Sequence, residues 1–321
     1  MPITTVGTFV RFSKVLLSVI AALALAAPVA ALEPSKPISH YRYELWEEAE
    51  GLPHYSINTL VQGADGYLWL GTYYGLVRFD GIEFKVFDKS NTPQLPSNQV
   101  SSLAVDKQGV LWIGTSKGLV ELKNGVFRPI TEDAIAGLWV RVLVVGKDDT
   151  LWVGTGSNGV FQGRNGQFHE FGAKGETVRS LALDGDGELW VGTHNGLWHF
   201  AQGKVYRLSK KDGLPDERVL SVLRTADGVV WIGTRVGIAC LRDGKIIALS
   251  NEPLLKDQVV WALKPDRHGN LWIGLLGGGL LRYSGGRFER LENSQRIVSQ
   301  SITALHEDRE GSLWIGSSGG G

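Results

Sequence analysis

The chain has 321 residues, of which 43% are hydrophobic and 21% charged, so it is apolar enough to fold and intrinsic disorder is excluded. Its 33 basic and 33 acidic side chains give a formal net charge of +0, which excludes a global field that would attract nucleic acid. The single cysteine, Cys240, excludes an intrachain disulfide framework and a cysteine-rich metal cluster. The 42 glycines and 11 tryptophans are typical of a repeat protein with many tight turns and a recurring large anchor.

Residues 1–31 are predicted to form a secretory signal peptide. Arg11 and Lys14 precede an apolar run from Val15 to Ala27, and small residues at 29–31 provide a site for a signal peptidase. A run of about 13 residues is too short for a helix across a hydrocarbon core of roughly 30 Å. The alternative is an uncleaved anchor that extends to Leu32. We therefore expect residues 32–321 to lie outside the cytoplasm.

Seven tryptophans recur at intervals of about 41 residues, and each is followed by an aliphatic residue and a glycine. They are Trp69, Trp112, Trp152, Trp190, Trp231, Trp272 and Trp314. A β-branched residue precedes each by twelve positions, and a glycine precedes six of them by three positions, with Asp149 as the exception. We expect the tryptophans to form the structural core of the repeat. The glycine after each is expected to permit either a close approach of neighbouring blades or a positive φ.

The first copy predicts four short antiparallel strands, over residues 57–60, 68–70, 76–79 and 83–87. Asp65 and Gly66 lie in the first turn, and Asp80 and Gly81 form the last, where Asp-Gly is a strong hairpin signal. No span has a sustained apolar period of about 3.6 residues, so helix content should be very low. A repeat of this size with four strands is typical of a propeller blade.

Seven copies predict an all-β fold, a seven-bladed β-propeller over residues 32–321. The last blade should be incomplete, because the seventh copy reaches Gly321 after its second strand. Residues 41–46 alternate like a strand and could join this blade as its outer strand, which would still leave one strand lacking. We therefore expect this chain to be the front part of a longer polypeptide.

The sequence from Gly66 to Gly81, GYLWLGTYYGLVRFDG, resembles the two-component regulator propeller repeat family. Trp46 and the Gly-Leu-Pro at 51–53 are similar to the start of the extracellular region of those sensors. The resemblance implies a periplasmic ligand-sensing region of a signal-transduction protein anchored in the inner membrane. The output it implies is a two-component sensor histidine kinase, with a diguanylate cyclase as the alternative. It also implies a second propeller, output domains and a homodimer in the full-length chain, and some members of the family sense oligosaccharides.

Ligand binding is expected where the copies differ, on the face that carries the loops before each first strand and the hairpins after each second strand. The candidate ligand-binding residues are Tyr73, Tyr74, Trp139, Arg179, His194, Arg235 and Trp261. Lys117 and Arg141 vary at the same face, and aromatic and cationic groups together suit a sugar or an acidic oligosaccharide. The alternative is that the tryptophans fill the channel and the arginines are solvated. Whether Arg141 and Arg179 point to the channel depends on strand register.

Three short motifs are expected to be turns rather than sites. They are the dinucleotide-like glycines at 154–159, the nucleophile-elbow pattern at 316–320 and the calcium-like acidic run at 184–188. We predict no cofactor, no metal and no catalytic residue in this segment. Two other functions stay open: an exported propeller enzyme, such as a lyase or a quinone-dependent dehydrogenase, and a protein-interaction scaffold. The enzyme would need convergent acid and base groups, for which only His194 is available.

Overall fold

A computed structural model describes residues 44–46, 51–54, 56–184, 187–249, 251–291 and 301–318. All of them belong to the unit Leu32–Gly321. The predicted signal peptide and residues 41–43 lie outside the described residues. Within the described ranges the chain is almost entirely strand and turn, with one short 3₁₀ helix, η3 (Lys210–Asp212). None of the helices described is long and apolar enough to cross a membrane.

Six four-stranded antiparallel sheets, blades 1 to 6, each follow chain order from the first strand to the fourth. Blade 1 consists of β1 (Ile57–Gln62), β2 (Leu68–Thr72), β3 (Leu76–Phe79) and β4 (Phe84–Phe87). Blade 2 consists of β5 (Val100–Val105), β6 (Leu111–Thr115), β7 (Gly118–Lys123) and β8 (Val126–Pro129). Blade 3 consists of β9 (Val140–Val145), β10 (Leu151–Thr155), β11 (Val160–Arg164) and β12 (Gln167–Gly172). Blade 4 consists of β13 (Val178–Leu183), β14 (Leu189–Thr193), β15 (Gly196–Ala201) and β16 (Lys204–Leu208). Blade 5 consists of β17 (Val219–Arg224), β18 (Val230–Thr234), β19 (Gly237–Arg242) and β20 (Lys245–Ala248). Blade 6 consists of β21 (Val260–Pro265), β22 (Leu271–Leu275), β23 (Gly279–Ser284) and β24 (Arg287–Arg290).

The prediction of a seven-bladed propeller is wrong, because the propeller has six blades. The seventh repeat supplies only β25 (Ser301–Glu307) and β26 (Leu313–Ser318) among the described residues, and these pair as a separate two-stranded sheet. Among the described residues the seventh repeat therefore adds a two-stranded sheet to the ring and not a seventh four-stranded blade. The two-stranded sheet contacts β21 and β22 of blade 6 on one side and β1 of blade 1 on the other. The all-β class and the very low helix content are confirmed.

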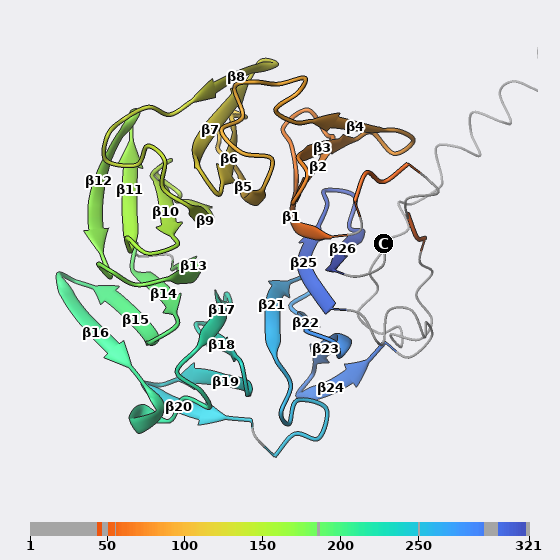
Figure 1. The fold of residues 1–321 in the computed structure, drawn as a ribbon. Helices are drawn as coiled ribbons and strands as arrows, with labels where there is room; N and C mark the ends of the chain where they lie inside the picture. Colours follow the sequence, from red (N-terminus) through yellow and green to blue (C-terminus); the bar gives the residue numbers. More distant parts are fainter. Residues whose placement is uncertain are drawn as a thin grey trace, which may run out of the picture. The chain divides into compact units, whose positions relative to one another are not determined.

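The first strand of every blade is the innermost one. Each contacts the first strand of the next blade, and β25 contacts both β21 and β1 (Figure 1). Residues 44–46 form no strand, but the Trp46 ring stacks on Trp314 of β26, with ring centroids 5.3 Å apart, and lies 5.5 Å from the Phe79 ring. The predicted outer strand is therefore absent from the described residues, and Trp46 covers this region as a packed ring.

The glycine two positions after each tryptophan is required by a close approach of neighbouring blades. A Cβ built on Gly71 would lie 2.7 Å from Cγ1 of Val100 in blade 2, and one on Gly192 would lie 2.8 Å from Cγ1 of Val219 in blade 5. None of the seven glycines has a positive φ. The same contact recurs at Gly114–Val140, Gly154–Val178, Gly233–Val260, Gly274–Ile302 and Gly316–Ile57. The repeated glycine and the repeated β-branched residue are thus two halves of one contact between blades.

A positive φ belongs instead to the position three residues before each tryptophan. Gly66 has φ 87° and Gly109 has φ 77°, and Asp149, the exception in the third copy, has φ 60°. Aspartate tolerates this left-handed conformation better than most residues other than glycine. Asp149 therefore preserves the turn conformation that glycine adopts in the other six copies.

Five of the repeat tryptophans are buried, whereas Trp112 and Trp314 are half-buried. In three copies the indole Nε1 donates to an aspartate six positions earlier. The distances are 3.0 Å from Trp112 to Asp106, 3.0 Å from Trp272 to Asp266 and 2.7 Å from Trp314 to Asp308. Asp106 also accepts from the backbone N–H groups of its own turn, at Gln108 and Val110. The acidic turn and the tryptophan thus hold each other in place.

Polar contacts join the two-stranded sheet to blade 1, along what we call the closure seam, between β25–β26 and β1. The backbone N–H of Gln62 donates to Nε2 of His306 at 3.2 Å, and Arg309 donates to the carbonyl oxygen of Gly63 at 2.9 Å. The Thr303 hydroxyl donates to the carbonyl oxygen of Ile57. The position of His306, opposite the repeat tryptophan, holds an aliphatic side chain in blades 1 to 5, such as Val61 and Ala104, and Lys264 in blade 6.

Burial within the closure seam lowers the pKa of His306 to about 4. The Lys264 ammonium and the Arg309 guanidinium reinforce this decrease in pKa, and Asp308 opposes it. Burial also lowers the pKa of Lys264, against the influence of Glu307. His306 is therefore neutral at pH 7, which leaves Nε2 able to accept the hydrogen bond from Gln62.

Candidate functional site

A one-residue β-bulge occurs near the start of every innermost strand. In blade 1, Ile57 pairs with Thr72 and Thr59 pairs with Gly71, so that Asn58 has no partner in the ladder. The same shift recurs in each of the other innermost strands. The bulged residues are Asn58, Ser101, Arg141, Arg179, Leu220, Trp261 and Thr303. A bulge re-aims its side chain, and these seven residues differ widely in size and charge.

The hairpin after each second strand lies at the same end as the bulges. A backbone N–H of the hairpin donates to the carbonyl oxygen of the residue that precedes the first strand of the same blade. Examples are Gly156 to Trp139 at 2.9 Å and Arg235 to Arg218 at 3.2 Å. We call this end, formed by the bulged residues and these hairpins, the bulge face. These hydrogen bonds join the loops before the first strands to the hairpins after the second strands, so the two sets of loops share one face, as expected from the sequence.

A buried threonine at the end of the second strand fixes each of five hairpins. In blade 5 the Thr234 hydroxyl donates to the carbonyl oxygen of Gly237 at 2.9 Å and accepts from the N–H of Val236 at 3.2 Å. The five threonines are Thr72, Thr115, Thr155, Thr193 and Thr234, and all are fully buried. Sequence reasoning missed them, although their constant place three residues after tryptophan was a readable signal. They hold the backbone that presents the variable residues.

Trp139 and Arg141 form the first cluster on the bulge face. The Arg141 guanidinium carbon lies 4.2 Å from the centroid of the Trp139 ring, a cation–π geometry. The Trp139 Nε1 donates at 3.1 Å to the hydroxyl of Ser101, a bulged residue of blade 2. The ring is 40% exposed although it is held from two sides. This arrangement presents a fixed aromatic surface beside a cation.

Arg179 and Trp261 form the second cluster. Both are bulged residues, and the Arg179 guanidinium carbon lies 4.6 Å from the Trp261 ring centroid. They belong to blades 4 and 6, which blade 5 separates along the ring (Figure 1), so the contact joins two blades that are not neighbours. The strand register places both Arg141 and Arg179 at bulged positions, and from there the Arg179 guanidinium reaches Trp261.

The environment of the bulge face disfavours the charged forms of both His194 and Arg141. Desolvation lowers the pKa of His194, with further lowering by the Arg141 and Arg218 guanidiniums, while Glu176 opposes it. Desolvation also lowers the pKa of Arg141, which is opposed by Tyr73 of blade 1. The Glu176 carboxylate is engaged by the Asn195 amide at 2.9 Å. Arginines from blades 3 and 5 and a histidine from blade 4 therefore share one electrostatic environment, which is suited to an anionic ligand.

The remaining candidate residues lie in the hairpins, and Tyr73 is close enough to Arg141 to influence the pKa of that guanidinium. Tyr74 is 62% exposed and packs on His54, with ring centroids 4.4 Å apart, and Tyr73 lies 6.5 Å from the same ring. Arg235 is exposed in the blade 5 hairpin and has no ion pair among the described residues. Lys117 is likewise exposed in the blade 2 hairpin.

The glycine motif at 154–159 begins in β10 and leads into β11, so no helix N-terminus follows it to hold a pyrophosphate. In the acidic run, Asp184 accepts from the N–H of Glu188 at 2.9 Å, as in a turn. Residues 185–186 of that run and residues 319–320 of the elbow pattern lie outside the described residues. Within the described ranges, no group of three or more His, Cys, Asp or Glu side chains could hold a metal ion.

Comparison with known proteins matches six segments of the chain to the family described as two component regulator propeller. The segments are residues 51–74, 94–117, 172–195, 213–235, 254–277 and 297–319. The chain belongs to this family. The repeat around Trp152 is the one that the match omits, and it is also the copy with Asp149 in place of glycine.

Solved structures similar to this regulator propeller include two extracellular domains from B. thetaiotaomicron. That of the putative hybrid two component system BT3049 is 22% identical with a TM-score of 0.72, covering 84% of this chain and 39% of that chain. That of the putative one component system BT4673 is 25% identical with a TM-score of 0.52, covering 82% and 39%. The regulator propeller thus spans less than half the length of these relatives.

A virginiamycin B lyase from Staphylococcus aureus is 14% identical with a TM-score of 0.65, covering 82% of this chain and 92% of that chain. At this identity the likeness shows the fold alone. No curated protein matches the regulator propeller. The comparisons therefore establish a propeller domain of the two component regulator type and assign no ligand to it.

Proposed function

We propose that this chain is the ligand-sensing region of an exported signal-transduction protein and that the ligand binds at the bulge face. The observation that carries the proposal is the pair of arginine–tryptophan stacks, Arg141 with Trp139 and Arg179 with Trp261. They stand at or beside bulged positions, where side chains vary without disturbing the ladder. Bulges are over-represented next to functional sites for this reason.

The chemistry of the bulge face supports an acidic oligosaccharide as the ligand. Exposed aromatic rings offer flat surfaces for pyranose rings, and guanidinium groups pair with carboxylates in charge-assisted hydrogen bonds. Tyr73, Tyr74, His194 and Arg235 extend the same surface toward its rim. The lowered pKa of His194 keeps it neutral at pH 7, so it would hydrogen-bond to hydroxyl groups.

Binding of acidic and matched neutral oligosaccharides to the full chain, measured by calorimetry, tests this proposal. Arg179→Ala should weaken binding of the acidic ligand by about tenfold to a hundredfold, since a charge-assisted hydrogen bond contributes about 1.5–3 kcal/mol. Arg287→Ala, an exposed arginine in β24, is the matched control and should leave affinity unchanged. Equal binding by the wild type and by the Arg179→Ala, Tyr74→Ala and Trp261→Ala variants would place the ligand elsewhere. Turnover of the ligand would favour the exported-enzyme hypothesis, and capture of a partner protein alone would favour the scaffold.

For the full-length protein we propose periplasmic exposure with an inner-membrane anchor and a histidine kinase output, with a diguanylate cyclase as the alternative. A second propeller and a homodimer are part of the same proposal. Support comes from the two extracellular relatives, which are longer than this chain. Reading the coding region beyond residue 321 tests the output. A fusion of residues 1–37 to a reporter that is active only outside the cytoplasm tests export, and a silent reporter would refute it.

A further inference from the structure

Rows of aromatic rings fill three of the interfaces between neighbouring blades. Each row begins with the repeat tryptophan of one blade, and its other two rings come from third or fourth strands of that blade or of the next. The ring-centroid distances are 5.7 and 5.4 Å for Trp69–Phe87–Phe127, 4.5 and 5.1 Å for Trp152–Phe171–Phe200, and 5.0 and 4.7 Å for Trp231–Tyr283–Phe288. Aromatic pairs at these separations stabilise an interface beyond their area of contact.

At the interface between blades 4 and 5, Trp190 continues into His199 and Tyr206 of its own blade, with ring centroids 3.5 and 6.1 Å apart, and no ring stands at the positions that Phe87 and Phe127 occupy between blades 1 and 2. Strand register places Leu208 where blade 1 has Phe87, since each pairs with the leucine that begins the apolar part of the third strand. Register likewise places Ile246 where blade 2 has Phe127, because the two pair with Leu241 and Leu122. Two rings are therefore replaced by aliphatic side chains beyond Trp190.

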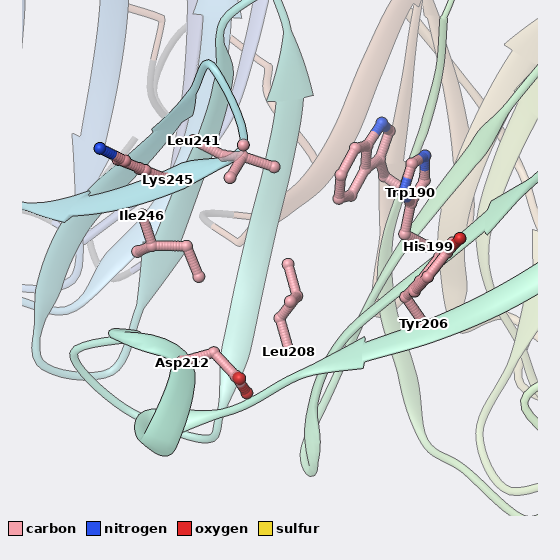
Figure 2. A pocket seen from close by; sticks show the side chains of 9 residues that line it. Trp190, His199, Tyr206, Leu208, Asp212, Leu241, Lys245 and Ile246 are labelled. Atoms are coloured by element: carbon pink, nitrogen blue, oxygen red, sulfur yellow. The ribbon is translucent and has the colours of Figure 1, made fainter.

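A pocket of about 780 Å³ lies at this interface. Its volume falls within the range of small-molecule sites, roughly 300–1,000 Å³. Figure 2 shows Leu241 and Ile246 on one side of the hollow, Trp190, His199 and Tyr206 on the other, and Leu208 between them. We call it the blade 4–5 pocket.

The polar groups around the blade 4–5 pocket are engaged or turned away. The His199 ring stacks on Trp190, with centroids 3.5 Å apart and planes within 5°, and its Nε2 lies 2.9 Å from a Glu188 oxygen. The Asp212 carboxylate accepts from both the N–H and the hydroxyl of Ser209 at 2.8 Å. The ammonium of Lys245 points away from the other labelled side chains (Figure 2). Among the described lining residues, His199 and Asp212 are thus already hydrogen-bonded within the protein, which favours a neutral ligand over an ionic one.

We propose that the blade 4–5 pocket binds a small neutral molecule with a planar aromatic ring. The ring lies in the hollow against Leu208, Leu241 and Ile246, next to the Trp190–His199 stack. The site is separate from the bulge face, which belongs to the opposite part of the blade, the innermost strands. Occupation of the pocket ties the outer strands of blade 4 to those of blade 5.

Indole is a suitable probe, because it is neutral, planar and small. Binding to the full chain is measured by saturation-transfer NMR and by the melting temperature in the presence of indole. We expect saturable transfer to indole and a rise in melting temperature, as for any ligand that binds only the folded state. Absence of both at millimolar indole overturns the proposal.

Two neighbouring residues of β20 provide a matched pair of variants. Ile246→Phe restores a ring in the pocket and should weaken indole binding at least tenfold without lowering the melting temperature. Ile247→Phe, at a position 47% exposed, should leave indole binding unchanged. Leu208→Phe is the second filling variant, and it should behave as Ile246→Phe does. Unchanged indole binding in both filling variants, or destabilisation by both, would show that no ring fits here and would refute the inference.

Discussion

Alanine at Gly192 should strain the contact between blades 4 and 5. The added Cβ would lie 2.8 Å from Cγ1 of Val219, 3.3 Å from its carbonyl oxygen and 3.4 Å from its Cβ. The first of these distances requires movement, whereas the other two are tolerable with small shifts. Overpacking of this kind costs about 1–3 kcal/mol of the free energy of unfolding. Gly192 has no positive φ, so the cost comes from packing alone.

The double variant makes this argument quantitative. Val219→Ala removes two buried methyl groups and should cost about 2–3 kcal/mol through lost transfer energy and a cavity. It also removes the Cγ1 atom that the new Cβ strikes, so Gly192→Ala in the Val219→Ala background should be nearly neutral. The cost of the double variant should therefore be smaller than the sum of the two single costs by about 1–3 kcal/mol.

Chemical denaturation followed by tryptophan fluorescence measures all four proteins of the cycle. Gly244→Ala is the control, because its φ is +72° and its Cβ would meet nothing within 4 Å. It should cost about 1–2 kcal/mol through backbone strain and should gain nothing from Val219→Ala. Strict additivity of Gly192→Ala and Val219→Ala would refute the role assigned to the repeated glycine.

Three further predictions concern the seam, the hairpins and the division between scaffold and site. His306 has its pKa lowered to about 4 in the fold, against about 6.5 in the unfolded chain, so the unfolded chain binds the extra proton between these values. The free energy of unfolding should be at its full value above pH 6.5 and should fall by about 2–3 kcal/mol as the pH decreases to 4. Chemical denaturation at several pH values in this range measures the decrease, and His306→Gln should make the free energy of unfolding less dependent on pH. Thr234→Val should cost about 1–3 kcal/mol by leaving the Gly237 carbonyl and the Val236 N–H without their partner, and Thr234→Ser should recover most of that loss. Arg235→Ala should change the free energy of unfolding by less than about 0.5 kcal/mol, whereas Trp231→Ala, at a buried ring, should cost about 3–5 kcal/mol; the reverse order would show that scaffold and site were assigned the wrong way round.

The repeat could be predicted from the sequence because its signals are local and repeated. Leu68, Trp69 and Leu70 stand in a strand as expected, and Asp80 and Gly81 stand in the hairpin after the third strand. The number of blades could not be predicted in the same way. A tryptophan followed two positions later by glycine marks the second strand of a repeat, whereas a blade also needs a third and a fourth strand, which the Trp314 copy does not supply among the described residues.

The face of the propeller that carries the candidate site could be predicted from the sequence, but the arrangement of its side chains could not. Hairpin residues such as His194 and Arg235 follow directly from the repeat, because each lies just after a second strand. The direction of Arg179 and its stack on Trp261 depend on a bulge, which adds one residue against the partner strand without any residue type that marks it. The pocket at Ile246 depends on which side chains from two different blades face each other, and this could be read only once the register was known.

The bulged residues have a consequence for protein engineering. Because none of the seven takes part in the ladder between the first and second strands, exchange of one side chain leaves every pairing in that ladder as it was. Asn58 and Thr303 bond to the backbone of neighbouring sheets, so a combinatorial library restricted to the other five codons would sample new recognition surfaces on an almost constant framework. Arg179 and Trp261 show that side chains grafted two blades apart can still reach one another, so such a library could select for pairs as well as for single contacts.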